Sequence, residues 1–273
     1  MSYDSTIYRG SAAYYRAGRP PYSAELESIL AREVGLDGTG RLLDAGCGPG
    51  ILAVRLAGLF EEVVGLDPDA DMLAEAFRHS AAQGITNAVW VQGLAEELPG
   101  VAPGPYRLVT FGQSFHWTQE ERVAEAVFDL LEPGGAMAMV VHTVKDRPRP
   151  ANLGHPPIPH DELTALVAKY LGPRRRVGQG LAPTRSHRFE DVLVKTRFGP
   201  PETFFIPGRP DLVRDSESVL SGYFSMATSA PHLFGDRQDD FAREVRQLLL
   251  GRSPTGLFWD RPGDTAIVLA RKL

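Results

Sequence analysis

The stretch Leu42-Leu43-Asp44-Ala45-Gly46-Cys47-Gly48-Pro49-Gly50 decides the fold class of this chain. Its apolar residues predict a buried strand over 41–45, and its three alternate glycines predict a turn that leads into a helix over 51–59. Glycine has no Cβ, so such a turn lets the backbone approach a ligand more closely than a side chain would allow. The sequence therefore predicts a small-molecule site at the end of this strand.

Strand and helix patterns alternate from Arg41 to His142, which is typical of a parallel sheet with helices on both faces. The expected strands cover 41–45, 62–66, 88–92, 106–111 and 136–142, and the expected helices cover 24–34, 51–59, 69–82 and 119–131. Two further strands are expected within 192–206 and over 265–270. We predict an α/β fold with a doubly wound, mostly parallel, seven-stranded sheet of the Rossmann-like kind.

The pattern changes after Val144, where prolines at 148, 150, 156, 157 and 159 exclude regular structure. Helices are expected again over 161–171, 210–226 and 236–250. We therefore divide the chain into an N-terminal arm with a lid helix (1–40), a cofactor-binding core (41–145), a cap or substrate region with a late strand (146–262) and the final strand of the core sheet (263–273).

Composition narrows the partners of the protein. The formal net charge is -5 and no long run of one sign occurs, so nucleic acid is disfavoured as a partner. Cys47 is the single cysteine, which excludes an internal disulfide and a cysteine-ligated metal site. No signal-like or membrane-spanning run is apparent, so we expect a cytoplasmic protein without a membrane partner. A homo-oligomer is compatible with the sequence. Only four of the 29 basic residues are lysines, which hints at a GC-rich bacterial genome.

Ligands of open parallel sheets bind beyond the carboxyl ends of the strands, where Asp44, Asp67 and the glycine turn are expected. A dinucleotide site needs the pattern G-x-G-x-x-G, but Ile51 occupies the place of the third glycine. A dinucleotide is therefore disfavoured, and a dehydrogenase is a distant alternative. A nucleoside without phosphates needs the close backbone approach, and a carboxylate such as Asp67 can accept from its ribose hydroxyls.

Four motifs, in the order in which they occur along the chain, resemble those of the class I S-adenosylmethionine-dependent methyltransferases. They are the 42–50 stretch, the acid that ends Val63-Val64-Gly65-Leu66-Asp67, the run Gly93-Leu94-Ala95-Glu96-Glu97-Leu98-Pro99, and Leu131-Glu132-Pro133-Gly134-Gly135. The resemblance covers about 40–144. It implies S-adenosylmethionine as cofactor and S-adenosylhomocysteine as product, with no metal.

The same resemblance implies roles for individual residues. The backbone at Gly46, Cys47 and Gly48 would face the methionine part, and Asp44 would support the loop or, through water, the ammonium group. Asp67 would accept from the ribose hydroxyls. The remaining expected cofactor contacts are an apolar adenine wall, the adenine rim and the loop after the fourth strand, formed by Pro68 and Met72, Ala95 and Glu96, and Gln113. A helix N-terminal acid is the alternative role for Glu96.

The segment Phe111-Gly112-Gln113-Ser114-Phe115-His116-Trp117 lacks the Asn/Asp-Pro-Pro-aromatic run of nucleobase amino methyltransferases. It is similar instead to a small-molecule subgroup, like trans-aconitate methyltransferases and natural-product tailoring enzymes. In that subgroup a segment like Tyr15, Arg19-Pro20 and Tyr22 closes on the cofactor, so Arg19 is expected at its carboxylate. The alternative is a surface arm whose tyrosines fill grooves.

Methyl transfer from a sulfonium needs alignment and a closed site, and a general base is optional. His116 is the candidate base; the alternative is a histidine bonded to the backbone and packed on Trp117. Phe115, Tyr8 and Tyr15 are expected to wall the acceptor pocket. The favoured acceptor is an amine nitrogen of a specialised metabolite, as in antibiotic tailoring. The alternatives are O-methylation of a small carboxylic acid or hydroxyl, and a sensor that binds the cofactor without catalysis.

Overall fold

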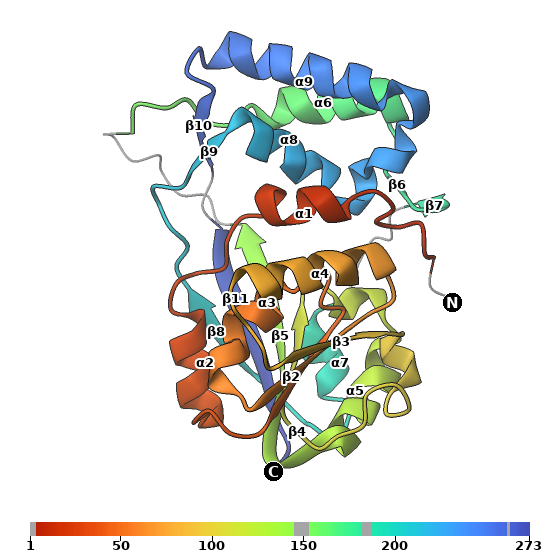
Figure 1. The fold of residues 1–273 in the computed structure, drawn as a ribbon, viewed down its shortest axis with the longest axis vertical. Helices are drawn as coiled ribbons and strands as arrows, with labels where there is room; N and C mark the ends of the chain where they lie inside the picture. Colours follow the sequence, from red (N-terminus) through yellow and green to blue (C-terminus); the bar gives the residue numbers. More distant parts are fainter. Residues whose placement is uncertain (1–3, 145–152, 182–186, 261–262) are drawn as a thin grey trace. The chain divides into compact units, whose positions relative to one another are not determined.

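The computed structural model describes residues 4–144, 153–181, 187–260 and 263–273. The chain divides into two compact units (Figure 1). The α/β unit comprises 22–143, 185–208 and 264–273, and the cap unit comprises 1–21, 144–184 and 209–263. Parts of the proline-rich segment predicted to be irregular, 146–152, lie outside the described residues. No helix among the described residues is long and apolar enough to cross a membrane.

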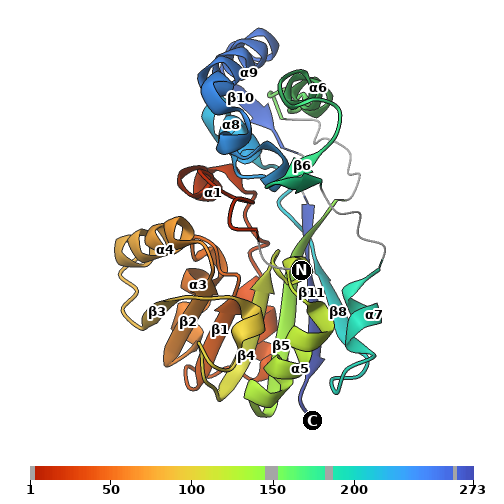
Figure 2. The same cartoon turned by 90° about the vertical axis from the view of Figure 1, so that its right-hand side faces the viewer.

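The α/β unit is built on a seven-stranded sheet, which confirms the predicted fold class. Its order is β3-β2-β1-β4-β5-β11-β8, from left to right in Figure 2. The pairs β1–β2, β1–β4, β2–β3 and β4–β5 are parallel, and β11–β8 is antiparallel. The strands are β1 (Arg41–Ala45), β2 (Glu62–Asp67), β3 (Ala88–Gln92), β4 (Tyr106–Gly112), β5 (Leu131–Val144), β8 (Glu202–Ile206) and β11 (Gly263–Arg271).

Helices cover both faces of this sheet (Figure 2). On one face Leu26 and Leu30 of α2 (Leu26–Val34) pack with Leu52 of α3 (Ile51–Leu56), and α4 (Ala70–Ala82) lies beside α3. On the other face, α5 (Glu120–Leu130) and α7 (Phe189–Leu193) bury Val127 and Leu193. Both faces are therefore apolar, as a parallel sheet covered by helices requires.

The helix predicted as a lid is instead part of this core. Leu26 and Leu30 of α2 are fully buried against the sheet, because their spacing of four residues aligns them on one helix face. The first unit boundary accordingly follows Pro21 and not residue 40. The strand expected within 192–206 is shorter than that segment. The segment begins with the end of α7, and β8 occupies only its last residues.

The cap unit has a separate, aromatic core. The cap unit consists of four helices and two short antiparallel strand pairs. The helices are α1 (Ala12–Gly18), α6 (His160–Leu171), α8 (Ser216–Phe224) and α9 (Gln238–Arg252). The strand pairs are β6 (Arg176–Val177) with β7 (Gly180–Leu181) and β9 (Val213–Asp215) with β10 (Leu257–Trp259). Phe224, Phe234 and Phe241 pack at its centre. Helix α1 falls in the arm, where no helix is predicted. Gly18 lets α1 approach α8, since a Cβ there would overlap the Ser221 carbonyl.

The carboxyl group of Asp44 joins three elements of the α/β unit. Asp44 lies near the end of β1. Its carboxyl group accepts a hydrogen bond from the Thr110 hydroxyl of β4 at 2.8 Å and another from the Ala53 N–H of α3 at 3.2 Å. Only 1% of Asp44 is exposed, and burial raises its pKa to about 7 although both hydrogen bonds lower it. Asp44 therefore positions the first turn of α3 over the end of the sheet.

The packing of Trp90 against Gly65 predicts a strong effect of one added methyl group. A Cβ at Gly65 would overlap the Trp90 ring and lie 3.0 Å from Cys47 Sγ. We expect Gly65→Ala to lower the free energy of unfolding by roughly 1–3 kcal/mol, since overpacked cores must shift. Gly58→Ala is the matched control, because a Cβ there meets nothing within 4 Å. Urea unfolding measures both, and equal stabilities of the two variants would contradict the packing argument.

The burial of Asp44 predicts a pH dependence of stability. Its pKa is raised from 3.8 to about 7, so the folded protein keeps a proton that the unfolded chain releases. The free energy of unfolding should therefore decrease as the pH rises from 4 to 7 and level off above. Relative to Asp44→Asn, which has no such proton, the wild type should lose roughly 2–3 kcal/mol between pH 5 and pH 8. Urea unfolding across this range measures the difference, and a constant difference would contradict the assignment.

Candidate functional site

The glycine turn after β1 is held in the left-handed region that its glycines permit. Gly46, Gly48 and Gly50 have φ of 67°, 53° and 71°. A Cβ on Gly46 would lie 2.5 Å from the Ser114 Cβ, and one on Gly50 would lie 2.7 Å from the Trp90 ring. A Cβ on Gly48 would meet nothing within 4 Å. Protein packing thus requires the outer two glycines, whereas the middle one leaves open space.

Every N–H of this turn is bonded within the protein. Gly46 and Cys47 both donate to the Leu66 carbonyl, at 2.7 and 3.0 Å, and Gly50 donates to the Cys47 carbonyl at 3.0 Å. Gly48 donates to Asp67 Oδ2 at 2.8 Å, and Pro49 has no N–H. Phosphate-binding turns aim free N–H groups at the anion. This turn has none, so the expected contact of its backbone with a ligand involves close approach and carbonyl oxygens and not N–H groups.

Asp67 ends β2 directly beside the turn. Its Oδ2 accepts from Gly48 and its Oδ1 accepts from the Asp69 N–H at 2.9 Å. Burial raises the pKa of Asp67 to about 6, while these two hydrogen bonds lower it. Each carboxylate oxygen can accept more than one hydrogen bond, so acceptor capacity remains for hydroxyl groups of a ligand.

The apolar residues expected at the site lie at the same edge of the sheet. Pro68 follows β2 and is half-buried, and Met72 is buried in the first turn of α4. Ala95 is buried in a 3-10 turn after β3. The Cys47 side chain is buried as well, and burial raises the pKa of its thiol, so it packs as an apolar group.

Glu96 has a structural partner that the sequence did not indicate. Its Oε1 accepts from the Gln119 N–H at 2.8 Å, at the start of α5. Its neighbour Glu97 accepts from the Leu94 N–H at 2.7 Å within its own turn. The alternative role of a helix N-terminal acid thus has direct support, and any contact with adenine must use the remaining acceptor sites of Glu96.

The loop after β4 contains a strained residue. Gln113 has φ of 59° and is the one residue other than glycine with positive φ among the residues that the structure describes. Its N–H donates to the Val140 carbonyl at 3.0 Å, and the next residue, Ser114, donates to the Ala45 carbonyl at 2.6 Å. Such conformations persist where neighbours enforce them, and they cluster at active sites.

Phe115 and His116, both expected at the acceptor, differ in position. The Phe115 ring is fully buried, 5.0 Å from the ring of Phe111 and 5.6 Å from that of Phe189. It belongs to the core and cannot wall a pocket in this conformation, because the 3-10 turn over 115–117 directs it inward. His116 is exposed, with its ring 4.9 Å from that of Trp117.

The expected arm residues lie together in the cap unit. The Tyr8 and Tyr15 rings meet edge to face at 6.1 Å, and the Arg19 guanidinium lies 4.5 Å above the Tyr15 ring. Arg19 Nη2 also donates to the Ser225 carbonyl at 2.5 Å. These contacts hold Arg19 within its own unit, and its expected contact with the cofactor remains a prediction.

The sequence did not indicate His142, which lies at the sheet edge beside Tyr22 of the segment expected to close on the cofactor. The rings of Tyr22 and His142 stack at 4.7 Å, and the Tyr22 hydroxyl lies 3.1 Å from the position of a Cβ on Gly112. His142 lies near the carboxyl end of β5. The rule that ligands bind beyond strand ends would have selected His142 from the sequence.

Comparisons with known proteins agree with this geometry. Residues 42–135 match the family described as "Methyltransferase domain". CRG1 of Saccharomyces cerevisiae, a "probable S-adenosylmethionine-dependent methyltransferase", is 25% identical over 194 residues, 67% of this chain and 65% of its own length. The uncharacterized methyltransferase Mb3374 of Mycobacterium bovis is 32% identical over 145 residues, 53% of this chain and 56% of its own length. The matches thus cover less than two thirds of these relatives.

Among solved structures, the [4+2]-cyclase SpnF superposes with a TM-score of 0.52 at 18% identity, covering 98% of this chain and 93% of that chain. This likeness concerns the fold. The family assignment rests on the sequence match: residues 42–135 of this chain form a methyltransferase domain.

Proposed function

We propose that this protein transfers the methyl group of S-adenosylmethionine to a small-molecule acceptor, and that the acceptor atom is an amine nitrogen of a specialised metabolite. The choice of cofactor rests on one observation: the turn over 46–50 has no free N–H group and lies beside the Asp67 carboxylate. Residues 46–50 offer no N–H group to a diphosphate, whereas ribose hydroxyls find a carboxylate with remaining acceptor capacity. A nucleoside without phosphates fits this combination.

The residues of the α/β unit fit this cofactor. Asp67 would accept from the ribose hydroxyls, and the open space at Gly48 would admit the adjoining chain. Pro68 and Met72 would bound the adenine on its apolar side, with Ala95 and Glu96 at the rim. Gln113 makes no side-chain hydrogen bond among the described residues, so its amide is available to the ligand. When bound, S-adenosylmethionine supplies a methyl group already activated by a sulfonium.

Arg19 and Tyr15 remain proposed cofactor contacts on the grounds of their chemistry. A guanidinium suits the carboxylate of the methionine part, since it offers several N–H donors in one plane. Tyr8, which contacts Tyr15, would lie on the acceptor side, where an aromatic face also attracts a cationic sulfonium.

Little covalent chemistry is required of the protein. Its residues would align the acceptor nitrogen with the methyl carbon and exclude water. One proton leaves the acceptor as the new carbon–nitrogen bond forms. We assign the removal of this proton to His116, which is exposed at the end of β4 and stands next to the strained loop.

An oxygen acceptor is the second candidate, because a hydroxyl or carboxylic acid would use the same alignment. The net charge of -5 argues for a small molecule over nucleic acid in either case. A methyl-release assay with labelled S-adenosylmethionine over amine, hydroxyl and carboxylate acceptors tests the proposal. Methylation of amines is expected. Cofactor binding without turnover on any acceptor would favour a non-catalytic sensor.

Asp67 should control cofactor affinity. In Asp67→Asn an NH2 group replaces one acceptor oxygen, and hydrogen bonds to a charged group contribute ~1.5–3 kcal/mol each. We expect the dissociation constant of S-adenosylhomocysteine, measured by isothermal titration, to rise at least about tenfold. The control is Asp71→Asn, at an exposed position of α4. Unchanged affinity in a folded Asp67→Asn protein would refute the assigned role.

His116 should affect turnover and not cofactor binding. We expect His116→Gln to lower kcat by roughly 100-fold near neutral pH, as loss of a general base does. The S-adenosylhomocysteine dissociation constant should not change. His155→Gln, in the cap unit, is the control. A kcat equal to that of the wild type would assign His116 the structural role on Trp117.

A further inference from the structure

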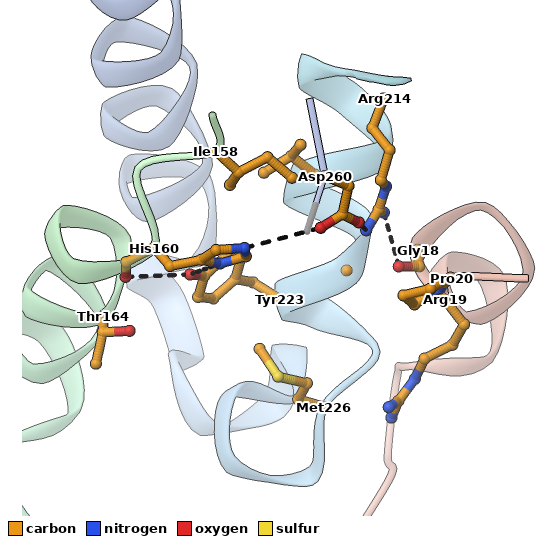
Figure 3. Close-up of a pocket in the computed structure, with 12 residues that line it drawn as sticks. Gly18, Arg19, Pro20, Ile158, His160, Thr164, Arg214, Tyr223, Met226 and Asp260 are labelled. Atoms are coloured by element: carbon orange, nitrogen blue, oxygen red, sulfur yellow. Dashed lines mark hydrogen bonds and ion pairs between the residues drawn. The ribbon is translucent and has the colours of Figure 1, made fainter. Parts of the chain in front are cut away.

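The cap unit contains an open pocket of about 310 Å3, and all of its lining residues belong to this unit (Figure 3). Its volume lies at the lower end of the range for small-molecule sites. Ile158, Val219 and Met226 contribute apolar surface. His160, Tyr223 and Asp260 contribute polar groups, and Figure 3 shows the His160 ring and the Asp260 carboxylate directed toward each other.

Asp260 is buried in this pocket with incomplete hydrogen bonding. Only 5% of the residue is exposed. Its Oδ2 lies 3.3 Å from Arg214 Nη1, and its Oδ1 lies 3.9 Å from His160 Nε2, beyond hydrogen-bond distance. No hydrogen bond to Oδ1 occurs within the described residues. Oδ1 is not among the fully buried polar atoms without a partner, and Asp260 lines the pocket, so a ligand that brings an N–H or O–H group can donate to this oxygen.

The two arginines that line the pocket have other partners. Arg214 Nη2 donates to the Gly18 carbonyl at 2.7 Å and also to the Ser218 carbonyl, and Nη1 faces Asp260. Arg19 donates to the Ser225 carbonyl, and in Figure 3 its guanidinium points away from Asp260 and His160. Neither guanidinium therefore offers an anion site in the pocket, whereas Asp260 would repel a carboxylate.

Tyr223 sets the position of the His160 ring. Its hydroxyl lies 3.4 Å from His160 Nδ1 and 3.5 Å from the His160 carbonyl oxygen. This leaves Nε2 on the side of the pocket, facing Asp260 across 3.9 Å. A small polar group between these atoms would contact both, as a bridging water does at such separations.

We propose that this pocket is a ligand site of the cap unit, and that its ligand is an uncharged amine or alcohol with a small apolar body. Its N–H or O–H donates to Asp260 Oδ1, its lone pair faces His160 Nε2, and its apolar part lies against Ile158, Val219 and Met226. Carboxylic acids are excluded by the charge of Asp260. Binding to this pocket does not rest on the methyl-transfer function proposed above.

Four ring compounds of similar size test the pocket on the full-length protein. Aniline and phenol carry a donor, anisole carries an acceptor only, and benzoate carries a negative charge. We expect saturation-transfer NMR titrations to give dissociation constants about tenfold lower for aniline and phenol than for anisole and benzoate. Equal affinities, absence of binding, or preference for benzoate would overturn the proposal.

Two variants locate the binding. Asp260→Asn should abolish the preference for donors over anisole, whereas Asp211→Asn, at an exposed cap position, should not. Circular dichroism checks folding, since Asp260→Asn also changes the partner of Arg214. His160→Phe, at a half-exposed position, leaves Arg214 and Asp260 unaltered and should weaken aniline binding about fivefold. Unchanged probe binding in a folded Asp260→Asn or His160→Phe variant would overturn the proposal.

A titration with S-adenosylhomocysteine on the same samples separates this inference from the proposed function. Binding of S-adenosylhomocysteine without selective probe binding would refute the proposed ligand site alone. Selective probe binding without S-adenosylhomocysteine binding would refute methyl transfer and leave the pocket as a ligand site.

Discussion

The hydrogen bonds that the turn over 46–50 makes to Leu66 and Asp67 are the constraint on which the site depends. Two N–H groups converge on the Leu66 carbonyl and a third on Asp67, so the turn is fixed to the end of β2 and not to a ligand. The same bonds hold the Asp67 carboxylate beside the open space at Gly48. The N–H groups of residues 46–50 are thus not offered to an anion, whereas Asp67 offers acceptor oxygens to hydroxyl groups. The class of ligand that suits this turn therefore depends on the internal partners of its backbone N–H groups.

Two buried carboxyl groups at this edge have different tasks. Asp44 is enclosed by Thr110 and Ala53, and burial raises its pKa to about 7, while Asp67 keeps acceptor capacity toward the ligand. Charge on Asp67 also raises the pKa of Asp44, so the two groups resist being ionised together. Ionisation is favoured when a positive charge is near. A cofactor with a sulfonium and an ammonium group, as proposed, would supply such charge.

Sequence patterns correctly placed the residues whose position is determined by the strand or helix that contains them. Strand ends fix Asp44, Asp67 and the three glycines, and apolar periodicity gave β3 at Ala88–Gln92 and α4 within one residue. Phe115 was misplaced because a 3-10 turn reverses which side chain faces the core, and adjacent residues cannot reveal that turn. The partner of Glu96 is 23 residues away, and His160 and Asp260 are separated by 100 residues. Such pairs are decided by tertiary packing, which local periodicity does not encode.

The two compact units each contain polar groups that suit a different ligand. The α/β unit contains Asp67 and the turn, whereas the cap unit contains the pocket with His160, Tyr223 and Asp260. A fold of this kind supports many reactions, so a ligand must be argued from the groups of a site and not from the sheet. Asp260 is bonded to Arg214 of its own unit, and Asp67 is bonded to Gly48 and Asp69 of its own unit. Because these hydrogen bonds share no group, the ligand preference of the pocket can change by substitution without a change in the bonds that hold the turn.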